Sequence, residues 1–398
     1  MPSTTTAISK LTISSIAPNA VQSEIRAMTV ECDRVGGINL AQGVCDTEMP
    51  QPVSSAAIDA ILHGKNIYTR LDGIAPLREA IAGKLERHNG LHCDPDSEVL
   101  VTSGATGGFL AVCMALLNPG DEAILFEPFY GYHRNTLLAL RVQPIIVPLA
   151  APDWKLDVEQ LAAAITPRTR ALVLNTPCNP SGKVFTRTEM EAIARLAEQH
   201  DLFVITDEIY EYFIYGKAKH ISFASLPGMA ERTITISGFS KTFSVTGWRL
   251  GYLAASRRWM PAIGYFHDLT YVCAPAPLQH GVAAGLLQLP DAYYTDLAAE
   301  YEEKRNLLCD ALTAADFKNT RPDGAYYILA DVTSVPGNDA KEKARQLLSK
   351  SGVAGVAGSA FFDQAGDDLQ GGENLLRFCF AKKKQELLQA CDRLRTFQ

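Results

Sequence analysis

The sequence predicts an α/β fold with a mainly parallel sheet, followed by a smaller α+β region. From Glu98 to Lys241, apolar runs of strand length alternate with helix-like segments. The predicted strands are apolar along their whole length, which is typical of strands that are buried on both faces. After about Pro290 the pattern changes to a long charged helix and shorter strands. Strands that alternate with helices of about 10–15 residues indicate a sheet with helices on both sides.

Composition narrows the class of protein. The chain has 398 residues, of which 47% are hydrophobic and 20% charged, so it can form two domains and a large core. The net charge is −7 without a basic block, which argues against nucleic acid or an anionic membrane as the main partner. Nine cysteines without a CxxC pattern indicate reduced thiols. The N-terminus lacks the apolar core of a signal peptide, so we expect a cytoplasmic location.

The first hundred residues contain few elements. A short helical pattern lies near Val21–Glu31, and a short apolar strand precedes the Gly- and Pro-rich loop Ile38–Pro52. A helix follows at Val53–His63. Asp72-Gly73 then marks a turn, and Pro76 is expected to start the next helix.

The alternating region follows in order. The predicted strands are VLVTSG, AILFEP, VQPIIVPL, RALVLNTP, LFVIT and TITIS, and the predicted helices are ATGGFLAVCMALL, FYGYHRNTLLAL and TRTEMEAIARLAEQH. The last helix is amphipathic and is expected to open at Thr188, with Glu191 three residues later. Beyond Pro290 we expect a charged helix at Tyr293–Leu312, the segment GAYYILADV, a helix, a VAGVAG strand, LLRFCFA and a final helix.

Lys241 is the candidate nucleophile. It comes where the strand TITIS ends, and Arg249 follows eight residues later. Ligands of open α/β sheets bind beyond the carboxyl ends of the strands. A desolvated lysine near an arginine suits an amine that must be partly deprotonated to attack a carbonyl. Taken alone, Lys241 also fits a solvated surface charge, as most lysines do.

Three further features are expected at the same edge of the sheet. Asp207 follows the strand LFVIT, and Tyr210 lies three residues later. Asn179 lies in NTPCNPSG, a turn whose prolines hold an amide side chain rigidly. The segment TSGATGG places backbone N–H groups at a helix N-terminus, which favours an anion such as phosphate. Each has an ordinary structural explanation, but together they indicate one site.

The sequence resembles the pyridoxal-phosphate-dependent aminotransferases of fold type I, class I/II. The most specific points of resemblance are the motifs NTPCNPSG, DEIY and SKTFSVTGWRLGY and their separations in the chain. The resemblance runs from INLAQG to LLRFCFAKK and is nearest to the branch with kynurenine, glutamine, methionine and aromatic aminotransferases. It implies a large cofactor-binding domain over residues 46–284 with a mainly parallel seven-stranded sheet between helices. Residues 1–45 and 285–398 would form a smaller α+β domain.

The resemblance also implies catalytic roles. Lys241 would hold pyridoxal 5′-phosphate as a Schiff base and, once displaced by substrate, move the proton between Cα and the cofactor. Asp207 would pair with the pyridine nitrogen, while Tyr210 and Asn179 would hydrogen-bond the ring oxygen.

The remaining implied contacts hold the phosphate, the ring and the substrate. Tyr130 would stack on the ring, and Arg377, with a backbone donor at Gly43, would bind the substrate α-carboxylate. The phosphate would be held by Gly104, Ala105, Thr106, Arg249 and, from a second subunit, Tyr68. Shared sites of this kind imply a homodimer.

The sequence departs from the family pattern in several places. Gly238 stands where Ser or Thr is common, so Ser237 or Ser240 would supply that hydroxyl. The N-terminal loop reads QGVCD where relatives often read QGFPD or GEPDF. Thr106 stands where some dicarboxylate-using relatives carry a lysine, so we expect a neutral or aromatic amino donor. Arg70 and Arg134 are candidate readers of a charged side chain, or solvated surface arginines.

We therefore expect transfer of an amino group from an L-amino acid to a 2-oxo acid with ping-pong kinetics. The alternative is another outcome on the same scaffold: β-elimination from a cysteine conjugate, decarboxylation, or a biosynthetic oxidase or cyclase step.

A ligand-sensing regulator would need a basic helix-turn-helix of about 60 residues, for which the chain offers too little before Gly43. No metal site is expected, because HNGLHC has no second ligand cluster. The sequence also lacks a GxGxxG motif after a strand, a GxSxG motif and a P-loop, which argues against a dinucleotide-binding fold, a nucleophile elbow and a P-loop nucleotide site.

Overall fold

The structure is a computed structural model that describes residues 12–17, 24–363 and 371–397. Its main sheet has seven strands in the order β2-β8-β7-β6-β5-β3-β4. Only β8 runs against its neighbours, β2 and β7, so the prediction of a mainly parallel sheet is confirmed. The strands are β2 Val99–Thr102, β3 Glu122–Glu127, β4 Gln143–Pro148, β5 Thr169–Asn175, β6 Phe203–Asp207, β7 Thr233–Gly238 and β8 Gly251–Ala254.

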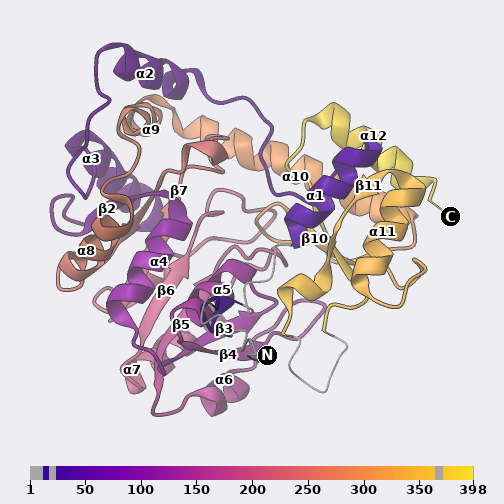
Figure 1. Cartoon of the computed structure of the whole chain (residues 1–398), viewed down its shortest axis with the longest axis horizontal. Coiled ribbons are helices and arrows are strands. Elements are labelled where there is room, and N and C mark those ends of the chain that lie inside the picture. The colour runs from indigo at the N-terminus through magenta and orange to yellow at the C-terminus, as the bar shows by residue number, and fades with distance from the viewer. Residues whose placement is uncertain (1–11, 18–23, 364–370, 398) are drawn as a thin grey trace, which may run out of the picture.

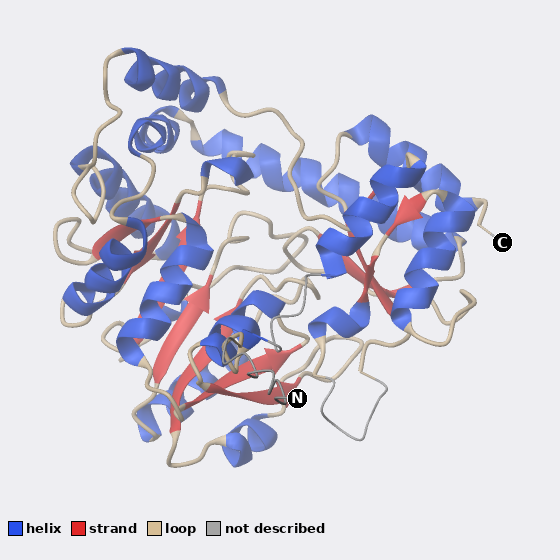
Figure 2. Ribbon diagram, viewed as in Figure 1, coloured by secondary structure: helices blue, strands red, loops and turns tan. Residues whose placement is uncertain are grey.

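Helices cover both faces of this sheet (Figures 1 and 2). Because successive side chains of a strand point to opposite faces, β5 contributes to two cores. Val173 packs in one core with residues of α4 and α8, whereas its neighbours Leu172 and Leu174 pack in the other with residues of α7. The helices of this region are α2 Gln51–Leu62, α3 Ala75–Lys84, α4 Gly104–Leu116, α5 Gly131–Ala139, α6 Val158–Ala164, α7 Arg187–Gln199, α8 Met260–Tyr271 and α9 Ala276–Gln288.

Residues 24–39 and 291–395 form a second α+β region. Its four-stranded sheet has the order β12-β13-β10-β9, and a separate parallel pair joins β1 to β11. The strands are β1 Ile38–Asn39, β9 Lys318–Asn319, β10 Tyr327–Asp331, β11 Val353–Ala354, β12 Val356–Ala357 and β13 Leu375–Cys379. The helices are α1 Glu24–Val35, α10 Asp291–Ala314, α11 Ala340–Ser351 and α12 Lys384–Arg395. Short π and 3-10 turns occur at Leu85–Asn89, Phe223–Ser225, Thr246–Trp248 and Gly358–Phe361.

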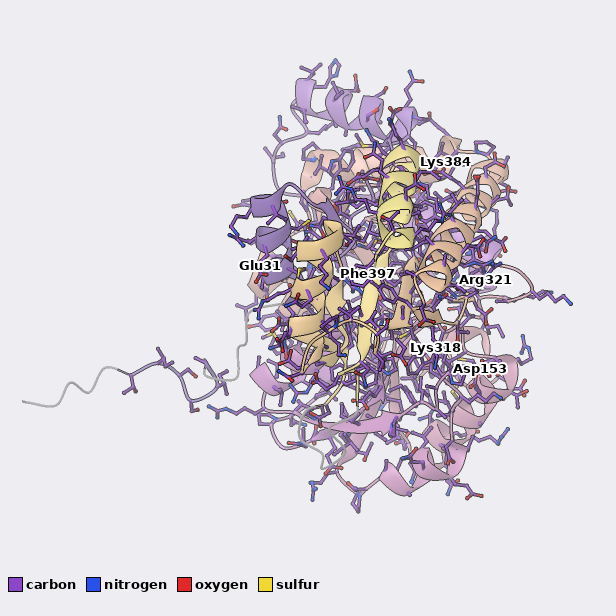
Figure 3. All side chains as sticks on the ribbon, turned by 90° about the vertical axis from the view of Figure 1, so that its right-hand side faces the viewer. Glu31, Asp153, Lys318, Arg321, Lys384 and Phe397 are labelled. Atoms are coloured by element: carbon purple, nitrogen blue, oxygen red, sulfur yellow. The ribbon has the colours of Figure 1, made fainter. Side chains whose placement is uncertain are left out.

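One core cluster joins residues 28–45 with residues from Leu297 onward, and it also includes Ile209, Tyr210, Phe213 and Tyr215. The division into a large domain, 46–284, and a small domain built from 1–45 and 285–398 stays a prediction. The outer face of the small region is charged, as Glu31, Arg321 and Lys384 show (Figure 3), and each of the three forms an ion pair there.

Across the described residues, no helix combines the length and apolar character needed to cross a membrane.

The structure corrects three local predictions. Helix α7 is capped by Thr186 and Glu189, which bond each other's backbone, rather than by Thr188 and Glu191. Both pairs have the required spacing, but Glu189 also accepts bonds from Lys183 Nζ and from the backbone of Leu156, which hold it at the first position.

The other two differences concern the ends of the chain. Helix α1 extends to Val35 instead of ending near Glu31, while residues 21–23 of the predicted helix lie outside the described residues. The segment VAGVAG forms two short strands rather than one, because β11 pairs with β1 and β12 pairs with β13.

Candidate active site

A cavity of about 260 Å³ lies at the carboxyl ends of β5, β6 and β7, facing β10 and β13 of the small region. Ten of the predicted site residues line it together. They are Gly43, Ala105, Thr106, Tyr130, Asn179, Asp207, Tyr210, Lys241, Arg249 and Arg377. Gly104 lies at its wall, and Tyr68 does not contribute to it within this chain.

Lys241 follows the end of β7 by three residues, and its amine points into the cavity region. Nζ donates a hydrogen bond to the Gly43 carbonyl oxygen at 3.1 Å and lies 5.5 Å from the ring centre of Tyr326. Burial lowers the pKa of this amine, and the guanidinium groups of Arg249 and Arg377 act in the same direction. The neutral amine, which is the nucleophilic form, is therefore favoured relative to an exposed lysine.

Asp207 ends β6 and is held by two groups. His133 Nε2 lies 3.1 Å from Asp207 Oδ2, and the backbone N–H of Ile209 donates to Oδ1 at 3.3 Å. His133 comes from α5 and packs against Phe109. We did not predict His133; its only signal in the sequence is the three-residue spacing from Tyr130, which places both on one side of the start of α5.

Two buried tyrosines meet beside the lysine. The hydroxyl oxygens of Tyr210 and Tyr327 are 3.0 Å apart, and Tyr210 is only 3% exposed. Burial raises the pKa of both phenols, so they remain protonated hydrogen-bond donors. Tyr327 was missed from the sequence because it lies in a β10 strand that is remote from the other motifs.

Arg377 is buried in β13 with one unused donor. Its Nη1 donates to Asn179 Oδ1 at 2.8 Å, and its Nη2 donates to the Ala41 carbonyl at 2.6 Å. Its Nε is buried without a hydrogen-bond partner among the described residues. Because Oδ1 of Asn179 accepts from Arg377, the amide NH2 of Asn179 is left to donate elsewhere. Asn175, which we did not predict, fixes the turn by accepting from the Asn179 backbone N–H at 2.7 Å.

The N-terminus of α4 forms an anion cradle. Gly104 has a φ of +74°, and a Cβ built there would lie 2.6 Å from Arg249 Nη2. A Cβ at Gly251 would lie 2.7 Å from the Ala105 nitrogen. Two glycines thus allow a guanidinium and free backbone N–H groups to approach the same point, as a phosphate requires.

The two serines near Gly238 lie in different surroundings. Ser240 lines the cavity, whereas Ser237 does not line it and donates to Glu211 Oε1 at 2.8 Å. A side chain at Gly238 would come within 3.1 Å of Leu250 O and Gly251 Cα, so the strand pair β7–β8 leaves little room for a hydroxyl there.

Three other predicted residues lie outside the cavity around Lys241. Tyr68 is 80% exposed and lies beside Arg70 in a separate surface pocket, where Arg70 pairs with Asp72 at 2.7 Å. Arg134 lines a neighbouring cavity and pairs with Asp363 at 3.3 Å.

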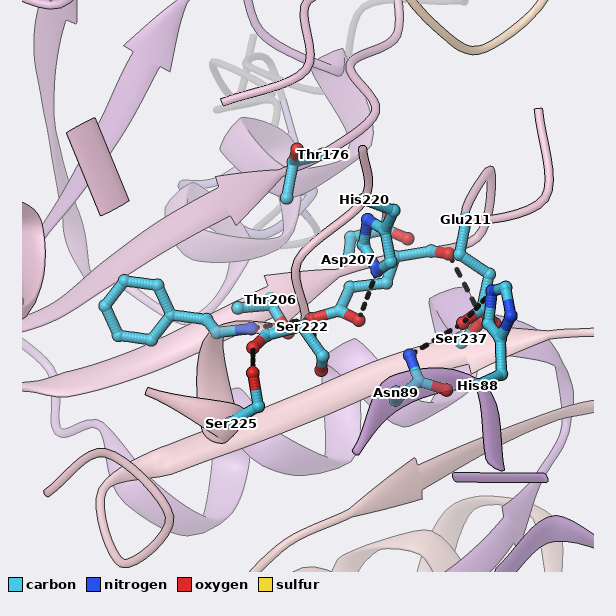
Figure 4. A network of polar contacts seen from close by, with 12 residues as sticks. His88, Asn89, Thr176, Thr206, Asp207, Glu211, His220, Ser222, Ser225 and Ser237 are labelled. Atoms are coloured by element: carbon cyan, nitrogen blue, oxygen red, sulfur yellow. Dashed lines mark hydrogen bonds and ion pairs between the residues drawn. The ribbon is translucent and has the colours of Figure 1, made fainter. Parts of the chain in front are cut away.

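A buried polar network lies behind Asp207 (Figure 4). Ligand atoms of Glu208, Glu211 and His220 lie within 4.8 Å of one another, which is the spacing of a possible metal site. However, Glu211 Oε2 already pairs with Lys84 Nζ at 2.5 Å, and Glu208 Oε2 pairs with His220 Nε2 at 2.9 Å. The lysine supplies the positive charge, so this cluster is a structural ion-pair network.

The fold and the site define the class of the protein. An amine beyond β7, a carboxylate beyond β6 and an anion cradle at α4 match the aldehyde, ring nitrogen and phosphate of pyridoxal 5′-phosphate. The residues present therefore fit this cofactor, and the chain has the architecture of a fold type I enzyme that depends on it.

Comparison with known proteins gives the family. Residues 35–394 match the model for aminotransferase class I and II, and the chain belongs to this family. It is 38% identical over 391 residues, 96% of this chain and 98% of the relative, to a probable N-succinyldiaminopimelate aminotransferase of Mycobacterium tuberculosis. A methionine aminotransferase of Escherichia coli is 34% identical over 358 residues, 90% of this chain and 91% of the relative.

Comparison with solved structures gives the same family. The structure of N-succinyldiaminopimelate aminotransferase from Mycobacterium tuberculosis matches with a TM-score of 0.92 at 37% identity, covering 97% of this chain and 99% of that one. The protein is thus a pyridoxal-phosphate-dependent aminotransferase, as the sequence predicted. These relatives differ in their named substrates, so they leave the amino donor open.

Proposed function

We propose that this enzyme moves the amino group of an L-amino acid to a 2-oxo acid in two half-reactions at the single cavity around Lys241. The observation that carries the proposal is that the Lys241 amine, with a pKa lowered by burial, lines the same cavity as Asp207 and Arg377. When bound, pyridoxal phosphate supplies an electron sink for the electron pair that remains when the substrate's Cα–H bond breaks.

Lys241 moves the proton in this mechanism. Its neutral Nζ would accept the proton from the substrate Cα and deliver it to the cofactor carbon that bears the transferred nitrogen; in the second half-reaction it would carry a proton in the opposite direction. Burial lowers the pKa of this amine and so favours its neutral form relative to an exposed lysine. Asp207 keeps a proton on the ring nitrogen, and His133, 3.1 Å away, fixes the carboxylate toward the cavity.

Arg377 orients the substrate. Its unpartnered Nε and its fork of donors suit the α-carboxylate, and its partners Asn179 and Ala41 prevent it from turning away. Tyr210 and the free amide NH2 of Asn179 would donate to the ring oxygen of the cofactor, Tyr130 would lie against its ring, and Arg249 with the start of α4 would hold its phosphate.

A spectroscopic half-reaction tests this function. Protein loaded with pyridoxal phosphate and then mixed with an amino acid alone should lose the chromophore of the aldehyde form and gain that of the amine form. A 2-oxo acid should reverse the change, and steady-state kinetics should be ping-pong. A keto acid that forms without amino transfer to a second substrate would contradict the proposal.

We also propose a homodimer in which Tyr68 completes the neighbouring site. Tyr68 and Ile67 are each 80% exposed and Leu62 is 76% exposed, an apolar group that a partner would cover. Mixing inactive Lys241→Ala protein with Tyr68→Ala protein should restore part of the activity, because one of the two sites in a mixed dimer is then intact. A monomer by light scattering, or no restoration, would contradict the shared site.

A cytoplasmic location completes the proposal. All nine cysteines are described, and all are free thiols. Reduced cysteines are typical of proteins in reducing compartments.

A further inference from the structure

A second, larger cavity adjoins the active site. It has a volume of about 930 Å³ and shares Ile25, Arg26, Tyr130 and Tyr132 with the cavity around Lys241. The first cavity, at about 260 Å³, is small for a ligand site, since such sites usually measure roughly 300–1,000 Å³. A bound cofactor would therefore fill most of it, and the side chain of an amino donor would continue into the second cavity.

Most charged groups of the second cavity already have an ion-pair or hydrogen-bond partner. Lys341 pairs with Glu24 at 2.8 Å, and Arg134 pairs with Asp363 at 3.3 Å. The remaining acids bind backbone N–H groups at the start of α11: Asp339 accepts from Glu342, and Glu373 accepts from Ala340.

Arg26 is the exception. It is exposed on α1, lines both cavities, and has no ion pair or hydrogen bond within the part of the chain that the structure describes. Helix α1 packs on β1, β11 and β12, at the side of the small region that faces the large one (Figure 1). Arg26 is thus a cation without a partner among the described residues, at the junction of the two cavities.

We propose that Arg26 is a specificity-determining residue that binds a carboxylate at the far end of the amino donor's side chain. The enzyme would then prefer long L-amino acids with a terminal carboxylate, whose α-carboxylate is held by Arg377 and whose distal carboxylate is held by Arg26. This inference rests on the proposed function and departs from the neutral or aromatic donor expected from Thr106. Thr106 brings no cation near the ring, but Arg26 supplies one farther out.

Two seven-carbon donors test the preference. L-2-aminopimelate and L-2-aminoheptanoate differ only in the terminal carboxylate, and each half-reaction is followed through the cofactor chromophore. We expect wild-type kcat/KM to favour L-2-aminopimelate, and Arg26→Gln to lower kcat/KM for that donor on the order of tenfold. The same variant should leave kcat/KM for L-2-aminoheptanoate within about twofold. Arg34→Gln, an exposed arginine later on the same helix, is the matched control and should change neither value.

A binding measurement separates recognition from chemistry. In calorimetry with the cofactor-loaded protein, pimelate should bind more tightly than heptanoate, and Arg26→Gln should remove that difference. Arg26→Lys should retain part of it, because a lysine keeps the charge but loses the bidentate fork.

Failure of this inference is distinguishable from failure of the proposed function. If wild-type protein converts none of a full panel of L-amino acids, these two included, the proposed function is wrong. If L-2-aminoheptanoate reacts as well as L-2-aminopimelate, and Arg26→Gln changes neither kinetics nor pimelate binding, only the assignment of Arg26 is overturned.

Discussion

Lys84 and Glu211 form a buried ion pair whose removal has a calculable cost. The two side chains are 6% and 3% exposed, and Nζ lies 2.5 Å from Glu211 Oε2. Nζ also donates to Asn89 Oδ1 at 2.9 Å and to the Tyr252 hydroxyl at 2.8 Å. Lys84→Met keeps the aliphatic volume but leaves a buried carboxylate without its counter-charge. Such a change typically costs about 3–5 kcal/mol.

This cost should appear as a shift in thermal midpoint. With an unfolding entropy of about 2.1 cal/mol/K per residue, about 3–5 kcal/mol corresponds to roughly 4–6 °C for a chain of this length. Calorimetry at a fixed scan rate measures the shift. The double variant Lys84→Met/Glu211→Gln should recover most of it, because a neutral pair in place of a buried ion pair is often tolerated.

The pH dependence gives a second check on the same pair. Burial alone would raise the pKa of Glu211, but Lys84, with His88 and His220, lowers it from 4.5 to about 2. A lowered folded pKa contributes stability that is present above the unfolded pKa and is lost as pH falls from about 4.5 towards 2. In Lys84→Met that contribution is missing, so the deficit should be largest near neutral pH and shrink in acid. A midpoint within about 1 °C of wild type, or a double variant no better than the single one, would refute this reasoning.

Four other variants test the site and its surroundings. Arg377→Lys should lower kcat/KM for every amino donor by about 10–100-fold, because a lysine cannot form the bidentate contact; an unchanged half-reaction rate would contradict this role. Ser240→Ala should weaken cofactor binding by roughly tenfold in a fluorescence titration, whereas Ser237→Ala should lower the thermal midpoint and leave cofactor affinity intact; the reverse pattern would show that the hydroxyls were misassigned. Gly43→Ala would place a Cβ 1.9 Å from the Tyr327 hydroxyl oxygen, so activity should fall strongly, and near-normal turnover would show that this wall can move.

The fold and the cofactor end of the site follow from local sequence signals. Apolar strands that end in polar residues placed Asp207 and Lys241 at one edge of the sheet, and the structure brings both to the same cavity. This worked because parallel strands share the edge at which their carboxyl ends meet. Gly104 was recognisable for a similar reason, since a glycine that opens a helix after a strand leaves N–H groups free for an anion.

Other residues depend on contacts that no local pattern contains. His133 contacts Asp207 although 74 positions separate them in the sequence, and Lys84 contacts Glu211 across 127 positions. Whether an arginine such as Arg26 faces a cavity or solvent is likewise decided by how α1 packs on the small region. Thr186 rather than Thr188 caps the helix because Glu189 has two further partners, the nearby Lys183 and the more distant Leu156.

Covalent attachment of the cofactor at one amine is the central claim, and peptide mapping tests it most directly. Cofactor-loaded protein is reduced with borohydride, digested and analysed by mass spectrometry. We predict one pyridoxyl group per chain, on the peptide that contains Lys241, and none on Lys241→Ala protein. A label on another lysine, or no label on protein that has bound the cofactor, would contradict the account.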